Sequence, residues 1–167
     1  MEYKQLNIDD ISFLKKVIGV DFVFTDEEKL VEYSHDETED LSYPPEVVLK
    51  PKTSDEIADV LKYCNAENIP VTPCGGRTGL SGGSLPIYGG VALSTERLNA
   101  IIEIDERNLQ ATVEPGVINQ FFRNAVSKKG LFYPPDPSSK GSCLLGGNLA
   151  ENAGGPRAVK YGVTKDY

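Results

Sequence analysis

The sequence predicts an α+β fold in two lobes, the first over about residues 47–104 and the second over about 107–167. Each lobe contains short apolar runs of the length of buried strands and one stretch with the apolar spacing of an amphipathic helix. A helical segment over residues 1–46 precedes them. A chain of 167 residues, 40% of them hydrophobic, is long enough to bury a core without disulfides.

Two helices are predicted in the N-terminal segment. Apolar residues one helical turn apart predict the first over residues 8–18, with Gly19 ending it. Thr25 and Glu28 have the spacing of a capping box, which predicts that a second helix begins there and runs to about Tyr33.

Strands and one helix alternate in the first lobe. A capping box of Thr53 and Glu56 predicts the start of the helix, whose apolar residues, Cys64 among them, share one face. The apolar runs predict strands over residues 47–49, 69–72, 91–93 and 101–104.

The second lobe begins with a predicted strand over residues 110–113 and an amphipathic helix that starts near Ile118 and ends before Gly130. Residues 133–161 are dense in Pro, Gly, Ser and Asn, and we expect an irregular segment there. Because apolar residues are interspersed in this segment, we expect it to be packed and functional rather than disordered.

The composition excludes several functions. The 17 basic and 25 acidic side chains give a net charge of −8, the wrong sign for binding nucleic acid or an anionic membrane. No apolar run approaches the roughly 18 residues of a transmembrane segment, and the N-terminus lacks a signal peptide, so we expect a cytoplasmic protein. Three cysteines and one histidine, without a Cys-x-x-Cys pair, predict no metal site.

A first glycine-rich segment, residues 73–83, follows the predicted strand over residues 69–72. Glycine lets the backbone turn several N–H groups toward one point, and such a nest binds phosphate oxygens without a net positive domain. Hydroxyl groups and one guanidinium can add donors. The candidate residues are Pro73, Gly75, Gly76, Arg77, Thr78, Gly79, Leu80, Ser81 and Gly82. The alternative for this segment is a flexible surface loop.

Two better-known phosphate motifs do not fit this segment. It lacks the Gly-Lys-[Ser/Thr] ending of a nucleoside triphosphate loop. No predicted helix begins directly after the glycines, as a Rossmann dinucleotide site requires. The predicted phosphate loop therefore belongs to another class.

A second glycine-rich segment, residues 133–157, has prolines that fix an extended path and paired glycines that permit close approach to a flat ligand. Its Ser and Asn side chains supply the neutral donors and acceptors that suit the edge of a flavin ring. The candidate residues, with one glycine further along the chain, are Pro135, Asp136, Ser138, Ser142, Cys143, Gly146, Gly147, Asn148, Asn152, Ala153, Gly154, Gly155 and Gly162.

Together the two segments resemble the FAD-binding domain of the vanillyl-alcohol oxidase and para-cresol methylhydroxylase superfamily, and within it the glycolate oxidase D subunit and D-lactate dehydrogenase branch. The resemblance covers about residues 43–167 and rests on two motifs in order. These are Gly-Gly-Arg-Thr-Gly-Leu-Ser-Gly-Gly, then Pro-Pro-Asp-Pro-Ser with Gly-Gly-Asn and Asn-Ala-Gly-Gly after it. It implies the two-lobed FAD-binding fold of the para-cresol methylhydroxylase type, with the second lobe incomplete in this chain.

The resemblance also implies a function. The first segment would hold the FAD pyrophosphate, and the second would line the isoalloxazine ring. The implied activity is the oxidation of a small 2-hydroxy acid such as D-lactate or glycolate, with hydride passing to the flavin N5. The expected electron acceptor is an electron-transfer protein or an iron–sulfur subunit.

Some positions depart from the family's pattern. Cys74 stands where relatives commonly carry arginine, and Thr78 stands where covalently flavinylated relatives carry their linking histidine, so we expect non-covalent FAD. The family's catalytic histidine and metal ligands lie later in its sequence, so no catalytic or metal-binding residue is assigned here. The chain resembles an N-terminal fragment, which we expect to be inactive alone.

Two alternatives stay open. The same loops would serve a nucleotide- or flavin-binding module without catalytic activity of its own. A UDP-sugar reductase or a sugar-lactone oxidase shares the implied fold, although the Pro-Pro-Asp-Pro-Ser sequence of residues 134–138 disfavours it.

Overall fold

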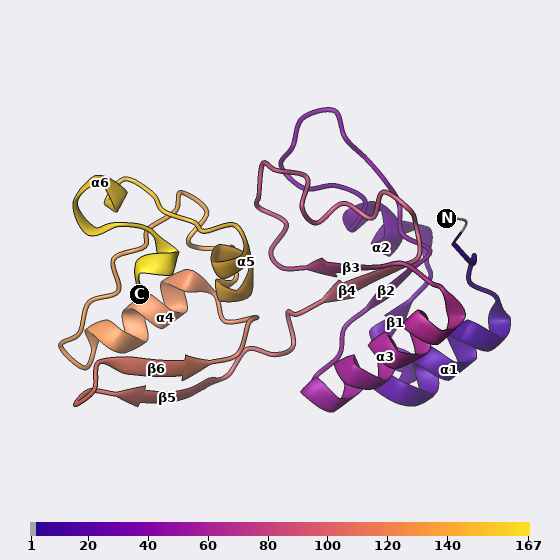
Figure 1. The fold of residues 1–167 in the computed structure, drawn as a ribbon, viewed down its shortest axis with the longest axis horizontal. Helices are drawn as coiled ribbons and strands as arrows, with labels where there is room; N and C mark the ends of the chain where they lie inside the picture. Colours follow the sequence, from indigo (N-terminus) through magenta and orange to yellow (C-terminus); the bar gives the residue numbers. More distant parts are fainter. Residues whose placement is uncertain (1–2) are drawn as a thin grey trace. The chain divides into compact units, whose positions relative to one another are not determined.

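A computed structural model describes residues 3–167, in which the chain forms two compact units (Figure 1). The first unit ends at Arg97 and the second begins at Leu98. This division precedes the strand over residues 101–104 that the sequence places in the first lobe, because that strand pairs with the next strand in the second unit. The mixed α+β class that the sequence predicts is confirmed.

The first unit contains a four-stranded sheet with the spatial order β1-β2-β4-β3. β2, β4 and β3 are parallel, and β1 pairs with β2 in the antiparallel sense. The strands are β1 (Val23–Phe24), β2 (Val47–Leu49), β3 (Val71–Cys74) and β4 (Val91–Ser94). The N-terminal segment is therefore part of the first unit, since it supplies the edge strand β1.

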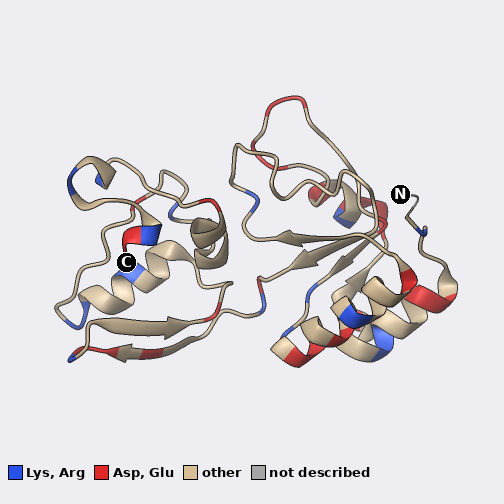
Figure 2. Cartoon of the chain, in the orientation of Figure 1, with Lys and Arg blue, Asp and Glu red and all other residues tan. Residues whose placement is uncertain are grey.

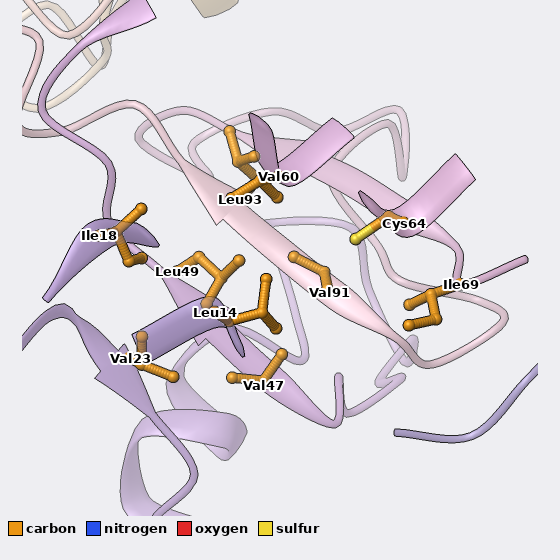
Figure 3. Close-up of a cluster of buried hydrophobic side chains, with 10 residues drawn as sticks. All are labelled: Leu14, Ile18, Val23, Val47, Leu49, Val60, Cys64, Ile69, Val91 and Leu93. Carbon is orange, nitrogen blue, oxygen red and sulfur yellow. The ribbon is translucent and has the colours of Figure 1, made fainter. Parts of the chain in front are cut away.

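Alternate residues of the central strands pack on opposite faces of this sheet. Val47 and Leu49 belong to one core, and Val48 between them belongs to another. The larger core, drawn in Figure 3, lies under α1 (Ile8–Ile18) and α3 (Ser54–Glu67). The smaller core lies under α2 (Glu27–Glu32) on the other face (Figure 1). Buried parallel strands with helices on both faces explain the continuous apolar runs in the sequence.

The predicted helices α1 and α3 are confirmed. Asn7 Oδ1 accepts the first N–H groups of α1, and the helix ends before Gly19, which adopts φ 90° and leads into a 3-10 turn, η1 (Val20–Phe22). Thr53 Oγ1 accepts the N–H of Glu56 at 3.1 Å, which begins α3. The carboxylate of Glu56 accepts the N–H of Lys52 rather than that of Thr53, so half of the predicted capping box forms.

α2 begins one residue later than the sequence predicts. Asp26 Oδ1 accepts the N–H of Lys29 at 3.0 Å, so Asp26 is the N-cap and the predicted cap at Thr25 is wrong. A carboxylate at the next position makes the bond that the threonine hydroxyl would have made. Tyr33, just past the end of α2, is fully buried in the smaller core.

β3 begins two residues later than predicted and continues through Cys74. The cause is the end of α3, where Asn68 adopts a left-handed conformation and Ile69 N donates to Cys64 O at 2.8 Å. Pro73 is accommodated because β3 is an edge strand of the described sheet, where a residue without an N–H can face outward.

The second unit contains the antiparallel pair β5 (Ile101–Asp105) and β6 (Gln110–Val113), with α4 (Asn119–Ser127) packed against it. The strand over 110–113 and the amphipathic helix that the sequence predicts are both present. The core between them contains Val117, Phe122, Val126 and Leu145, flanked by Ile101, Ile104, Val113, Leu131 and Tyr133.

The segment that the sequence predicts to be irregular contains helices. They are α5 (Leu145–Ala150) and α6 (Ala158–Tyr161), and a 3-10 turn, η2 (Thr164–Asp166), follows the segment. The prediction is wrong here because hydrogen bonds to distant residues stabilise α5. They outweigh the low helix propensity of its glycines. Leu145 N donates to Val117 O at 2.9 Å, and Gly146 N donates to Pro115 O at 2.8 Å.

The charged residues are mixed in sign along the helices of the first unit. Figure 2 shows acidic and basic residues interspersed along α1 and α3. Over residues 3–167, no group of three or more His, Cys, Asp or Glu side chains is arranged to hold a metal ion. None of the helices in this range combines the length and apolar character that crossing a membrane requires.

Asp10 joins the N-terminal segment to α3. Its side chain is 1% exposed, and its Oδ1 accepts hydrogen bonds from Lys4 Nζ at 2.8 Å and from the Tyr63 hydroxyl at 2.6 Å. Its Oδ2 accepts the N–H of Asn7 at 2.8 Å. Burial alone would raise the pKa of Asp10, but these hydrogen bonds hold it below its usual value. In return, the hydrogen bond to Asp10 raises the pKa of Tyr63 to about 12.

We expect Asp10→Asn to lower the free energy of unfolding by about 2 kcal/mol, because an amide cannot replace the carboxylate as acceptor for all three donors. Asp9→Asn, an exposed position in the same helical turn, should change it by about 0.5 kcal/mol or less. Denaturant titration of both variants measures the difference. Equal losses of stability would contradict the role given to Asp10.

The lowered pKa of Asp10 also predicts a pH dependence. Because the folded pKa lies below the unfolded value of about 3.9, the stabilisation is present above about pH 5 and is lost as the pH falls toward the folded pKa. Between about pH 5 and 3, the free energy of unfolding should therefore fall more steeply for the wild type than for Asp10→Asn.

Candidate functional site

The first glycine-rich segment leaves the sheet at the carboxyl end of β3. Because β2 and β4 run parallel to β3, the residues that follow them, Lys50 and Thr95, lie at the same edge of the sheet. Ligands of open sheets with parallel strands bind outside this edge. Residues 75–83, called the glycine loop below, are therefore in the place where such a sheet offers a site.

The main chain of the glycine loop presents unpaired donors. Within residues 3–167, no backbone N–H from Gly75 to Leu80 donates a hydrogen bond. The far end of the loop is fixed, since Glu37 N donates to Gly79 O and Gly82 N donates to Thr38 Oγ1, both at 3.0 Å. Unpaired N–H groups in a turning main chain are the donors from which anion-binding nests are built.

Two residues turn the loop with left-handed backbone conformations, Arg77 at φ 54° and Gly82 at φ 72°. Beside them, a Cβ placed on Gly79 would meet no atom within 4 Å. The space next to Gly79 is therefore not used by the packing of the described chain. It is the place where a ligand can approach the main chain closely.

The Arg77 side chain does not extend toward this space. Its guanidinium lies 3.8 Å from the centre of the Tyr33 ring, and its Nη2 is 3.0 Å from Glu32 Oε1. Its Nη1 is 3.5 Å from Glu96 Oε1. The side chain is 16% exposed. The sequence suggests the Arg77 guanidinium as a donor to a phosphate. In the structure, the guanidinium instead pairs with the carboxylates of Glu32 and Glu96.

The same edge of the sheet carries a partly buried polar network. The Tyr33 hydroxyl donates to Glu96 Oε1 at 2.7 Å, and Lys50 Nζ donates to Glu96 Oε2 at 2.7 Å. Burial alone would raise the pKa of Glu96, but the hydrogen bonds from Lys50 and Tyr33 hold it below its usual value. Burial raises the pKa of Tyr33. The half-buried carboxylate of Glu96 is thus kept ionised by its neighbours.

Cys74, directly before the glycine loop, has the environment of a packed residue. It is buried in the smaller core, and its Sγ lies 3.6 Å from the carbonyl oxygens of Thr72 and Ser84. Burial raises the pKa of its thiol to about 11, so the thiol is neutral and a poor nucleophile. Of the other predicted residues, Pro73, Leu80 and Ser81 are exposed, and Gly75, Gly76 and Thr78 are half-buried.

In the second segment, Asp136 is surrounded by cations. Its buried carboxylate lies 2.5 Å from Arg123 Nη1, 2.8 Å from Lys140 Nζ and 3.4 Å from Arg157 Nε. The hydrogen bond from Lys140 and the charges of the two arginines hold the pKa of Asp136 below its usual value against its burial. The geometry assigns Asp136 to the internal structure of the segment, because its acceptors are already used.

Most glycines of the second segment are enclosed by the chain itself. At Gly155, with φ 112°, an added Cβ would lie 2.0 Å from Asp136 O, and at Gly146 it would lie 2.7 Å from the Pro115 Cβ. Similar contacts enclose Gly154 and Gly162. Gly141 and Gly147, by contrast, would each carry a Cβ without any atom within 4 Å. Of the two, only Gly147 is among the predicted cofactor residues.

Two buried amides lack hydrogen-bond partners among the described residues. Neither amide atom of Asn119 is satisfied, although its side chain is fully buried, and Nδ2 of Asn148 is also unpaired. Buried polar groups are nearly always satisfied, so each of these atoms marks a place for a water or a ligand. Asn148 is a predicted site residue. Asn119 is not, because an asparagine at the start of an amphipathic helix gives no signal of its own.

The other predicted residues of this segment have mixed surroundings. Ser138 and Ser142 are exposed, and Pro135 and Cys143 are buried. Asn152 Oδ1 accepts the N–H of Lys165 at 3.0 Å. Ala153 O accepts both donors of Thr164.

Comparison with known proteins assigns a family. The model of a family described as "FAD binding domain" matches residues 45–167. Glycolate oxidase subunit GlcD of Bacillus subtilis is 49% identical over 135 residues, which cover 81% of this chain and 29% of that protein. D-lactate dehydrogenase of Anaerostipes hadrus is 47% identical over 123 residues, 74% of this chain and 26% of that protein. The chain thus spans less than a third of the length of these relatives.

Solved structures support the fold. An alkyldihydroxyacetonephosphate synthase matches 98% of this chain and 35% of its own, with a TM-score of 0.87 and 20% identity. A p-cresol methylhydroxylase matches 74% of this chain and 25% of its own, with a TM-score of 0.66 and 27% identity. Since the family model matches well over half of the chain, the chain belongs to the family of FAD binding domains.

Proposed function

We propose that this chain is the FAD-binding part of an oxidoreductase that oxidises a small 2-hydroxy acid such as D-lactate or glycolate. The observation that carries the proposal is the run of unpaired N–H groups from Gly75 to Leu80 at the carboxyl edge of the parallel strands. Its relatives include proteins named glycolate oxidase subunit GlcD and D-lactate dehydrogenase, which supports the substrate class.

The pyrophosphate of FAD is the part of the cofactor that suits the glycine loop. It is an anion, and backbone N–H groups bind its oxygens without requiring a net positive surface. This independence from positive charge matters because the chain has a net charge of −8. The open space at Gly79 would let the phosphates come close to the main chain.

The isoalloxazine ring suits the second segment. Gly147 leaves its backbone accessible, and the unpaired Nδ2 of Asn148 is a neutral donor that an oxygen or nitrogen on the edge of the ring would satisfy. The enclosed glycines and the ion pairs of Asp136 would hold this segment in shape around the ring.

When bound, FAD supplies the two-electron chemistry of the proposed reaction, and this chain's residues bind and orient it. We assign no catalytic base or metal ligand to residues 3–167. An electron-transfer protein or iron–sulfur subunit is the proposed electron acceptor, and a cytoplasmic location remains a prediction from composition.

We expect Gly79→Asp to reduce the FAD affinity of the complete protein by about a hundredfold or more. A carboxylate about 4 Å from a phosphate at a protein surface adds roughly 4 kcal/mol of repulsion, and each 1.4 kcal/mol is about tenfold in affinity. Because nothing lies within 4 Å of the new Cβ, the fold should tolerate the change. Titration with FAD, with Tm measured alongside, tests this.

Gly141→Asp is the matched control, since its Cβ also meets no atom within 4 Å and it lies outside the predicted cofactor residues. This variant should retain FAD. If Gly79→Asp binds FAD as tightly as the wild type, the glycine loop does not hold the pyrophosphate.

Acid precipitation of the flavin-loaded protein should release all of the flavin into the supernatant. Thr78 has no ring nitrogen with which to form the covalent link of the flavinylated relatives. Visible absorbance of the supernatant and of the washed pellet measures the partition. A pellet that stays yellow would show a covalent link and contradict non-covalent binding.

The complete protein should reduce an artificial dye acceptor with D-lactate or glycolate as electron donor. The assay compares turnover with that of free FAD at the same concentration. Stoichiometric FAD without turnover on either acid would contradict the proposed substrate class and favour the cofactor-binding module.

A further inference from the structure

We propose that Arg77 is a positioning residue that holds the glycine loop in its anion-binding conformation through its side chain, without contacting the cofactor phosphates. This inference rests on the proposed FAD function. It concerns how the loop is kept in shape rather than which ligand it binds.

The backbone of Arg77 needs such support. Its φ of 54° is in the left-handed region, which residues with a Cβ adopt at a cost and which persists where surrounding contacts enforce it. Arg77 lies in the middle of the run of unpaired N–H groups from Gly75 to Leu80. If its backbone relaxed to a negative φ, the directions of the N–H groups on either side would change, and with them the shape of the proposed nest.

The side chain of Arg77 supplies the support. The guanidinium stacks on the ring of Tyr33 at 3.8 Å and pairs with Glu32 at 3.0 Å and Glu96 at 3.5 Å. Glu32 belongs to α2, Tyr33 follows it directly, and Glu96 follows β4. The side chain thus links the glycine loop to two other elements of the first unit.

The partners of Arg77 are themselves fixed. Tyr33 is fully buried, its hydroxyl donates to Glu96 at 2.7 Å, and the Ser94 hydroxyl lies 3.2 Å away, where it can donate to the Tyr33 oxygen. Lys50 donates to Glu96 at 2.7 Å. A side chain held by such neighbours fixes the backbone from which it comes.

The local charge argues against a direct phosphate contact. Arg77, Lys50 and Lys29 pair with Glu32 and Glu96, so each cation of this cluster already has a carboxylate partner. To reach a phosphate, the guanidinium would leave the Tyr33 ring and both carboxylates. The N–H groups of the loop need no such help, because they are neutral donors already unpaired.

The decisive variant is Glu32→Gln, measured as the FAD dissociation constant of the complete protein. If Arg77 contacted phosphate, removing a nearby acid would leave FAD binding unchanged or tighten it. With Arg77 acting as an anchor, the loss of its 3.0 Å partner should weaken FAD binding about threefold. Glu28→Gln makes the same charge change at an exposed position of α2 and should leave the affinity unchanged.

A second pair of variants separates the backbone from the charge. Arg77→Ala and Arg77→Gly both remove the guanidinium, but glycine adopts the left-handed conformation freely. Arg77→Ala should weaken FAD binding about thirtyfold, and Arg77→Gly should bind about fivefold more tightly than Arg77→Ala. Equal affinities of the two variants would show that the left-handed backbone of Arg77 does not limit binding.

The outcomes distinguish this inference from the proposed function. Wild-type protein that does not bind FAD would overturn both. Wild-type protein that binds FAD, together with unchanged or tighter binding by Glu32→Gln and equal affinities of the two Arg77 variants, would overturn the anchoring role alone.

Discussion

Parallel pairing of β4 between β2 and β3 determines where the polar groups of the first unit come together. Because the three strands share one direction, the residues that follow them lie at one edge of the sheet. The glycine loop begins at this edge, and Lys50 and Glu96 lie there too. The apolar strand residues are buried on both faces, so the register cannot slip without exposing a core. The geometry of the loop thus depends on packing some distance from it.

The two units treat charge in opposite ways. In the first, every cation of the network near the loop is paired with a carboxylate, and the unpaired donors are neutral main-chain amides. In the second unit, three cationic side chains pair with the buried carboxylate of Asp136. An acidic chain can bind an anionic cofactor by the first arrangement, because neutral donors avoid the desolvation cost of unpaired buried charges.

The features that could be predicted from the sequence are those determined by residues close together in the chain. The helix over residues 8–18, the cap at Thr53 and the position of the glycine loop after a strand all follow from neighbouring residues. α5 does not, because its first N–H groups are satisfied by carbonyls about thirty residues earlier in the chain. The pairing of Arg77 with Glu32 joins residues far apart in the sequence, so it could not be predicted either. The unsatisfied amide of Asn119 depends on its burial in the fold, which no neighbouring residue indicates. A residue type can be read from the sequence, but which way its side chain points is decided by the fold.

Pro73 has a consequence beyond its place in β3. Parallel sheets fold slowly, and an open edge strand exposes a row of N–H and C=O groups on which another chain can pair and aggregate. At the β3 edge of the described sheet, the exposed Pro73 removes one donor from that row, and the glycine loop turns the chain away directly after Cys74. At the opposite edge, β1 is two residues long and offers little to pair with. The first unit therefore resists intermolecular strand addition at both edges.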